Sequence, residues 1–296
     1  MYEMIHCRIF GLPDLDQDNP FVRSTLKNWV SHIVKDYGID GLRIDTLPYV
    51  DNTFWTEFAA AANVYQIGEV FTGDTSIVAS YQGPVDAVLN YPLYFTLKDV
   101  FESNQSMYNI RVKINEVKSK FKDVTVLGNF LDNHDNVRFL YSNPNPTLLK
   151  NALVFLLYHE GIPIIYYGTE QEFKGGDDPY NREVLWTSMN TNSEIYKLIE
   201  TSIKYRKKNE IWNLDEVERY VDHPFYAFTR GKVLICVTNN PTGTQTYTLG
   251  YHPYSENTKL YNILDTSDTI TVKSGVLTVT MSGKPKVYVT SLTDYE

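Results

Sequence analysis

Apolar residues recur along the first part of the chain with two different spacings. Within residues 20–36 they follow a helical spacing that places Leu26 and Trp29 on one face, and Gly38 can end this helix. Residues 39–45 form a short, mainly apolar run that predicts a buried strand. An amphipathic helix is therefore followed directly by a buried strand.

The same alternation continues to about residue 207. Strands that are apolar on both faces and alternate with helices are typical of a parallel sheet covered by helices, either open or closed into a barrel. This places the first part of the chain in the α/β class. Further helices are expected at 52–62, 94–103, 107–120, 146–158 and 193–207, and further strands at 64–70, 85–92, 123–131 and 161–168.

The pattern changes after residue 209. Short stretches rich in β-branched and aromatic residues are now separated by Gly, Asn and Ser turns. They lie at 225–240, 244–250, 269–283 and 284–292. We therefore expect two domains, an α/β domain over residues 1–209 and an antiparallel β domain over residues 210–296.

Composition narrows the class of protein. The chain has 296 residues, of which 43% are hydrophobic and 21% charged, as in ordinary globular proteins. A formal net charge of −9 argues against a nucleic-acid partner and is compatible with a neutral substrate. We expect no membrane-spanning helix, because no run of about 18 apolar residues occurs, and the first residues show no signal-peptide pattern. Cys7 and Cys236 form no metal-binding motif.

Three expected strands are followed by an acid. Asp45 follows the run GLRI, Glu69 follows YQIG, and Asp135 lies in NFLDNHDN. In parallel βα folds the carboxyl ends of the strands meet on one face, where active sites form. One such acid alone is as well explained by a cap or a loop, but three together indicate a catalytic site.

The chemistry that suits converging carboxylates is glycoside cleavage, because His and Cys at metal-ligand spacing are absent from the sequence. It requires one ionised carboxylate as nucleophile and one protonated carboxyl as acid. Arg43 lies two residues before Asp45, hence on the same strand face, and is expected to keep it ionised. Burial and the negative charge of Asp135 are expected to favour the protonated form of Glu69.

Several segments resemble the signature segments of glycoside hydrolase family 13, the α-amylases, and most of all those of the fungal-type secreted enzymes. The resemblance extends from about residue 11 to 209 and continues more weakly through the β domain. The segments are LPDLDQ (12–17), GLRIDTLPYV (41–50), IGEVFTGD (67–74), VDAVLNYPLYFTL (85–97), FLDNHDNVRF (130–139) and GIPIIYYGTEQEFKGGDDPYNREVLW (161–186).

The resemblance implies a (β/α)8 barrel followed by an antiparallel β-sandwich, and a secreted enzyme that cleaves α-1,4-glucans such as starch, glycogen and maltooligosaccharides. By this resemblance Asp45 is the nucleophile, Glu69 the general acid and base, and Asp135 the third acid, which binds ring hydroxyls. Arg43 orients the nucleophile. The implied mechanism is retaining, with the two reacting carboxyls roughly 5–5.5 Å apart.

Three further residues match substrate contacts of the family, and Tyr49 stands at a fourth contact position where the chain departs from the fungal pattern. The resemblance implies that His134 hydrogen-bonds the sugar at the cleaved bond. Tyr49 ends a Pro-Tyr pair where the fungal pattern has Lys-His, so it is expected to stack on or hydrogen-bond the acceptor-side sugar. Asp178 and Arg182 match donor-side sugar contacts, although a surface ion pair between residues four apart explains them equally well.

The sequence also departs from the family. The Asp-Asn-His segment at the end of the third barrel strand is absent, so about strands 4–8 are expected. Such a barrel has open edges, and we expect an oligomer or a partner to cover them. For the structural Ca²⁺ of the family, Asp16 matches one ligand and the carbonyl of Tyr49 suits another, but the remaining ligands are missing. A plain turn acid is the alternative for Asp16.

Other functions remain open at this level. A transglycosylase or an α-glucosidase of the same family would share every residue named above. A catalytically inactive, glucan-binding protein derived from an amylase is a second alternative, and a gene fragment is a third.

Overall fold

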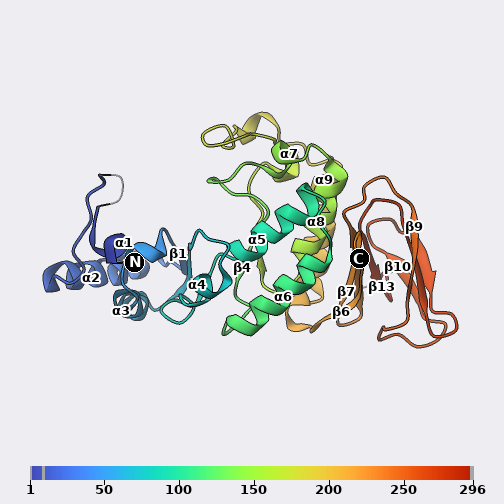
Figure 1. Cartoon of the computed structure of the whole chain (residues 1–296), viewed down its shortest axis with the longest axis horizontal. Coiled ribbons are helices and arrows are strands. Elements are labelled where there is room, and N and C mark those ends of the chain that lie inside the picture. Colours follow the sequence, from blue (N-terminus) through green and yellow to red (C-terminus); the bar gives the residue numbers. More distant parts are fainter. Residues whose placement is uncertain (1, 9–10, 294–296) are drawn as a thin grey trace. The chain divides into compact units, whose positions relative to one another are not determined.

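The computed structural model describes residues 2–8 and 11–293 (Figure 1), and the chain divides into two compact units. The first unit comprises Met1–Pro92 and Asn115–Asn129, and the second comprises Leu93–Ile114 and Phe130–Glu296. None of the helices described in these ranges is long and apolar enough to cross a membrane. A parallel βα part is followed by antiparallel sheets, as the sequence predicts.

The first unit is built on a parallel three-stranded sheet in the order β1-β2-β3. Its helices are well delimited by the sequence. Pro20 occupies the first turn of α2 behind the N-cap Asn19, and Gly38 ends the helix in the left-handed conformation at φ 61°. The elements are α1 (Tyr2–His6), α2 (Pro20–Tyr37), β1 (Gly41–Ile44), η1 (Leu47–Tyr49), α3 (Asn52–Ala62), β2 (Tyr65–Gly68), α4 (Thr75–Ala79), β3 (Ala87–Val88) and β4 (Gly128–Asn129).

Helices α2 and α3 cover one side of β1. A cavity of about 370 Å³, which we call the α2–α3 groove, lies among them, and its lining is mainly apolar. Trp29 lines it and is 54% exposed. Strand β1 is at the end of the sheet order, so within the described ranges its outer edge has no strand partner. The groove is lined by Gln17, Leu26, Trp29, Val30, Ile33, Ile39, Leu42, Arg43, Ile44, Asp45, Val50, Phe54, Trp55 and Phe58.

The second unit contains the remaining helices and all the antiparallel strands. Helix α5 and helix α6 each extend across a unit boundary in sequence. The elements are α5 (Tyr91–Leu97), the π-helix η2 (Lys98–Glu102), α6 (Tyr108–Lys120), α7 (Phe139–Ser142), α8 (Pro146–Tyr158), β5 (Ile162–Pro163), η3 (Thr169–Gln171), η4 (Leu185–Thr187), α9 (Glu194–Lys208), η5 (Ile211–Asn213), β6 (Glu216–Val221), β7 (Phe225–Arg230), β8 (Val233–Thr238), β9 (Gln245–Leu249), β10 (Lys259–Asn262), β11 (Thr269–Thr271), β12 (Leu277–Met281) and β13 (Lys286–Val289).

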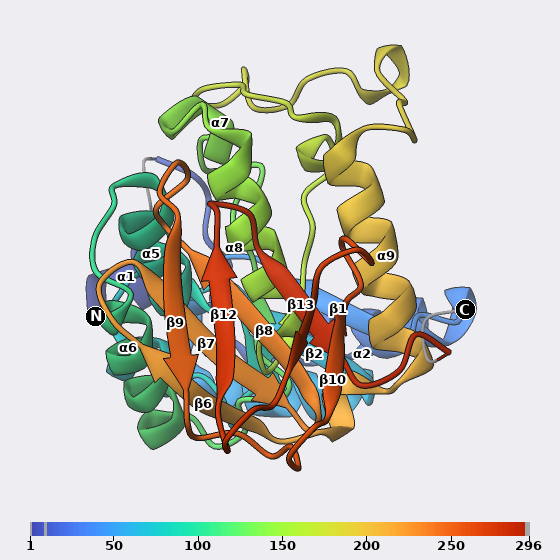
Figure 2. The same ribbon diagram turned by 90° about the vertical axis from the view of Figure 1, so that its right-hand side faces the viewer.

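The antiparallel strands form a sandwich of a six-stranded sheet, in the order β11-β10-β13-β8-β7-β6, and the pair β12-β9 (Figure 2). Alternate residues of β7 face opposite sides. Phe225 and Ala227 belong to the core between the two sheets, whereas Tyr226 and Phe228 belong to the core that contains α8. Strands β7 and β8 are thus buried on both faces, which explains why both are mainly apolar.

Helix α8 is the centre of the second unit. Asn145 caps its start, and its residues from Ala152 to Tyr158 are all buried. Phe155 makes edge contacts with Tyr226 and Phe228 of β7. Because the helix packs on the sheet, residues on both sides of position 209/210 belong to one compact unit.

Three predicted strands are much shorter than expected. The runs at 85–92, 123–131 and 161–168 contain only the two-residue strands β3, β4 and β5. In the third run Pro163 has no N–H to donate to a ladder, and Ile162 and Ile164 are exposed rather than buried. An apolar run becomes a strand only where a neighbouring strand hydrogen-bonds to it. The short helices α1, α4 and α7 were not predicted from the sequence, because they are too brief to show a periodic pattern.

Candidate active site

Asp45 and Glu69 follow two neighbouring strands of the first unit. Strands β1 and β2 are parallel, with Arg43 opposite Ile67 and Ile44 opposite Gly68. Past the last strand residues the backbone N–H of Glu69 donates to the carbonyl of Ile44 at 2.9 Å. This bond continues the ladder to the end of both strands. The two acids therefore emerge side by side at the carboxyl edge of the sheet.

The turn after Asp45 is held in place by packing. Thr46 adopts a left-handed conformation with φ 46°, and the 3-10 helix η1 follows it. Leu47 is fully buried against Gly68, where a Cβ atom would come within 2.5 Å of the Leu47 side chain. The indole N–H of Trp55 donates to the Leu47 carbonyl at 2.8 Å. A glycine before Glu69 is therefore a packing requirement of the turn that follows Asp45.

One guanidinium contacts both acids. Arg43 Nη1 donates to Asp45 Oδ1, and Arg43 Nη2 lies 3.3 Å from Glu69 Oε1. The Asp45 side chain is 68% exposed, whereas that of Glu69 is only 8% exposed. The sequence predicts the pairing of Arg43 with Asp45, and the structure adds Glu69 as a second partner. One carboxylate is thus open to a ligand and the other is enclosed.

Two further groups hold Glu69, and neither was predicted from the sequence. The hydroxyl of Tyr91 donates to Glu69 Oε1 at 3.3 Å, and the backbone N–H of Thr46 donates to Oε2 at 3.3 Å. Tyr91 is fully buried at the start of α5. The sequence carries no signal for this contact, because residues 69 and 91 meet only through tertiary packing. Both oxygens of Glu69 are therefore occupied by donors.

Asp135 lies in the second unit, in a loop that begins with a buried acid. Asp132 is enclosed and accepts the hydroxyl of Thr169 at 3.1 Å; burial raises the pKa of its carboxyl to about 6. The side-chain oxygen of Asn133 accepts from the backbone N–H of Asp135 at 2.9 Å and from the amide of Asn136 at 2.8 Å. The loop therefore has its own internal hydrogen bonds.

The predicted residues His134, Asp135, Asp178 and Arg182 form one cluster in this unit. His134 Nε2 lies 3.2 Å from Asp135 Oδ2. Arg182 Nε lies 2.9 Å from Asp178 Oδ1, and Arg182 Nη2 lies 3.5 Å from Asp135 Oδ1. The i,i+4 ion pair is present, and the same guanidinium also reaches the third acid. Whether these side chains contact a sugar stays a prediction.

Asp45 and Glu69 belong to the first compact unit and Asp135 belongs to the second. The convergence of all three acids therefore remains a prediction. Tyr49, the expected acceptor-side and calcium residue, ends η1 in the first unit and is partly exposed.

The expected calcium ligands, Asp16 and Tyr49, do not form a complete metal site by themselves, and calcium binding stays a prediction. Asp16 lines a cavity of about 300 Å³ together with Asp14, Asp18 and Asp51, but Tyr49 does not line it. Oδ1 of Asp16 accepts the backbone N–H of Asp18 at 3.0 Å, as in a turn. Within the described ranges no group of three or more His, Cys, Asp or Glu side chains could hold a metal ion. The residues present therefore do not fit a complete calcium shell.

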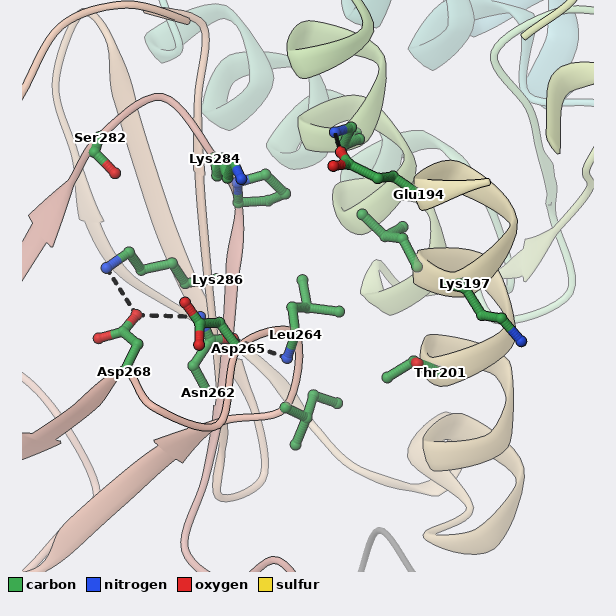
Figure 3. A pocket seen from close by; sticks show the side chains of 14 residues that line it. Glu194, Lys197, Thr201, Asn262, Leu264, Asp265, Asp268, Ser282, Lys284 and Lys286 are labelled. Atoms are coloured by element: carbon green, nitrogen blue, oxygen red, sulfur yellow. Dashed lines mark hydrogen bonds and ion pairs between the residues drawn. The ribbon is translucent and has the colours of Figure 1, made fainter. Parts of the chain in front are cut away.

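The second unit contains a cavity of about 570 Å³ (Figure 3), and none of the predicted site residues lines it. It is formed by α8, α9 and the turns beside β10 and β13. Two ion pairs lie in its lining. Lys286 lies 2.8 Å from Asp268, and Lys150 contacts Glu194. Lys197, Lys284 and Asp265 also line it, outside these two pairs.

Two known families together match almost the whole chain. Residues 2–212 match the family described as the α-amylase catalytic domain, and residues 218–293 match α-amylase domain C. Alpha-amylase 1 of Schwanniomyces occidentalis is 38% identical over 294 residues, which cover 95% of this chain and 57% of that protein. The Beta/alpha-amylase of Paenibacillus polymyxa is 39% identical over 290 residues, which cover 93% and 24%, respectively.

Solved structures give the same picture. An α-amylase from Malbranchea cinnamomea superposes with a TM-score of 0.93 at 35% identity, covering 97% of this chain and 64% of that one. The α-amylase of Geobacillus thermoleovorans, solved in complex with acarbose, superposes with a TM-score of 0.87 at 28% identity, covering 97% and 68%. The chain therefore spans 57% and 24% of the length of the two sequence relatives, and about two thirds of these structures.

Proposed function

The chain belongs to the α-amylase family, and on that premise we propose that it is an endo-acting hydrolase of α-1,4-glucosidic bonds in starch, glycogen and maltooligosaccharides. One observation carries the proposal. A single guanidinium, that of Arg43, contacts two carboxylates at the ends of adjacent parallel strands, one exposed and one enclosed. A glycosidase of the two-carboxylate type uses such a pair of acids, one as nucleophile and one as general acid.

The two carboxylates would divide the reaction between them. Asp45, the exposed one, attacks the anomeric carbon and forms a glycosyl ester, while Glu69 gives its proton to the leaving glycosidic oxygen. Glu69 then takes a proton from water, which attacks the ester and releases the sugar with its configuration retained. The Tyr91 hydroxyl and the Thr46 N–H fix the orientation of Glu69 for both proton transfers.

Asp135 completes the proposal as the third acid. Arg182 and His134, which both contact it, would then lie on the donor side of the substrate. Support for this assignment comes from the match to the catalytic-domain family, which includes residue 135.

Release of reducing ends from soluble starch tests the activity. The wild-type chain is expected to release them, and Glu69→Gln is expected to lower kcat by at least about 10³-fold, because the amide cannot supply the proton. The circular-dichroism melting temperature serves as the control for folding. A wild-type rate no higher than that of the variant would refute the proposal for this chain.

The second candidate function is glucan binding alone, which the partly exposed side chains of Asp135, Asp178 and Arg182 would serve. A glucan-binding protein without catalysis would retain the sugar contacts and lose turnover. Co-sedimentation with insoluble starch separates the two. If both the wild type and Glu69→Gln sediment with starch and neither releases reducing ends, the chain is a glucan-binding protein without catalysis.

We propose an extracellular location, which follows from the resemblance to secreted α-amylases and agrees with one surface feature. Asn104 begins the tripeptide Asn-Gln-Ser, is exposed, and lies between η2 and α6. An acceptor for N-glycosylation must be exposed in this way. We propose Asp16 and the backbone carbonyl of Tyr49 as two of the six to eight oxygen ligands that a Ca²⁺ ion takes.

A further inference from the structure

Asn181 is enclosed between two exposed neighbours. Its side chain has 0% exposure, whereas Tyr180 is 75% exposed and Arg182 points to Asp135. The amide nitrogen of Asn181 lies 2.8 Å from the carbonyl oxygen of Asn136, 3.0 Å from that of His134 and 3.4 Å from that of Asn133. An amide nitrogen carries two hydrogens, so it can serve the two nearer acceptors fully and the third in part.

These three carbonyls belong to the loop that carries Asp135. Within the loop, the side-chain oxygen of Asn133 accepts a hydrogen bond from the backbone N–H of Asp135. From a separate segment, the Asn181 amide donates to main-chain carbonyls on both sides of Asp135. The adjacent Arg182 adds a bond from Nε to the His134 carbonyl at 3.2 Å. A shift of Asn181 would therefore move both the third acid and the guanidinium that contacts it.

The segment around Asn181 is itself firmly anchored. Glu183 accepts from Arg138 Nε at 2.7 Å and from the backbone N–H of Gly175 at 2.7 Å. Arg138 is fully buried and also donates to the Tyr167 carbonyl at 2.8 Å. A Cβ atom at Gly175 would lie 1.9 Å from the backbone oxygen of Tyr180, so only glycine allows this approach. These contacts fix the position of the segment that carries Asn181.

We propose that Asn181 is a positioning residue, whose amide fixes the His134–Asp135 loop so that the third acid is aligned with Arg182 and the sugar. This inference rests on the proposed glycosidase function. Only a side chain with two hydrogen-bond donors at this position can satisfy the carbonyls. An aspartate has nearly the same shape, but its oxygens would face three carbonyl oxygens without any donor between them.

The test compares Asn181→Asp with a matched control, Asn239→Asp. Asn239 is also buried, at 2% exposure, and its amide donates to the carbonyls of Val100 and Gln105 at 3.2 and 2.7 Å. Both changes place a carboxylate against main-chain oxygens, so both lower the melting temperature. Two signals are followed besides melting: kcat and KM on soluble starch, and the His134 ring signal in the ¹H–¹³C NMR spectrum, assigned by its loss in His134→Gln.

Asn181→Asp is expected to lower kcat by about 10- to 100-fold with KM changed less than about twofold, and to move the His134 signal. Asn239→Asp is expected to leave kcat and that signal at their wild-type values. If Asn181→Asp changes only the melting temperature, as the control does, the proposal is wrong. If Asn181→Asp does not fold, Asn181→Ala is measured in the same way and decides by the same two signals.

The outcome stays separable from the proposed function. If the wild-type chain shows no activity above Glu69→Gln, the glycosidase proposal fails, and the NMR signal alone decides on positioning. Movement of the His134 signal in Asn181→Asp but not in Asn239→Asp then supports the role of Asn181. An unmoved signal in both variants overturns it.

Discussion

At the scale of single residues, Glu102 is a buried acid that costs stability. Its side chain is 5% exposed at the end of η2, with Lys98 Nζ 3.9 Å away. The pKa of its carboxyl is raised from 4.5 to about 7, mainly by burial; Lys98 and Ser142 oppose the shift, and the nearby Asp132 and Asp99 add to it. The folded state therefore prefers the protonated carboxyl.

Replacing Glu102 with Gln tests this cost. Below pH 4.5 the carboxyl is protonated in both the folded and the unfolded chain. As the pH rises from 4.5 to about 7 only the unfolded chain ionises, so the free energy of unfolding of the wild type falls. Glu102→Gln is expected to gain roughly 2–3 kcal/mol relative to the wild type between pH 4.5 and pH 8.

Urea denaturation at several pH values measures this difference. Asp36→Asn, which removes an exposed carboxylate from α2, controls for the loss of a negative charge, because Asp36 does not act on the pKa of Glu102. A difference between Glu102→Gln and wild type that is independent of pH would contradict the prediction, because a carboxyl with the same pKa in the folded and unfolded chain gives no such dependence.

The residues of the candidate site differ in how far the sequence reveals them. Arg43 and Asp45 were predicted to share a face because side chains in a strand repeat every two residues, and they are in contact. The contacts of Tyr91 with Glu69 and of Asn181 with the Asp135 loop were not predicted. They join positions 22 and 47 residues apart, and no local pattern encodes such a pairing.

At the scale of elements, helices were predicted better than strands. Helices α2, α3, α8 and α9 begin and end within about a residue of their expected bounds, because caps such as Asn19 and Gly38 mark their ends in the sequence. The strands at 85–92, 123–131 and 161–168 were overestimated. The residues of a segment show that it is apolar. Its length as a strand depends on a hydrogen-bonded partner strand, which the segment itself does not specify.

Helix α8 provides the prediction at this scale. Leu153 is fully buried in the core that α8 shares with β7, β8 and α9. Leu153→Ala is expected to lower the free energy of unfolding by about 2–5 kcal/mol, because it leaves a cavity in that core. Since helix and sheet share one core, amides of β7 and β8 are expected to lose hydrogen-exchange protection together with those of α8.

Hydrogen exchange followed by mass spectrometry measures this coupling. Lys204→Ala on α9 is the control, because its side chain is 66% exposed and its ion pair with Glu200 contributes only a few tenths of a kcal/mol. Loss of protection in α8 with unchanged protection in β7 and β8 would show that the β-sandwich is stable by itself, as a domain boundary at residue 209/210 implies.

At the scale of the whole molecule, the α2–α3 groove is apolar surface that a folded chain ordinarily covers. Trp29 stands in it half exposed, and β1 beside it has a free edge within the described ranges. Unpaired strand edges and apolar patches promote association. In a purified preparation the only surface that can cover the groove is another copy of the chain.

We therefore expect the purified chain to self-associate, with a mass by light scattering that exceeds the single-chain mass of 34.2 kDa and rises with concentration. Trp29→Glu is expected to bring the mass back to that of one chain, because association would bury an unpaired charge. Tyr37→Glu places the same charge on the same helix, at a position that is 79% exposed and does not line the groove, and should leave association unchanged. A wild type that stays monomeric at every concentration would mean that the groove and the edge of β1 attract no second copy.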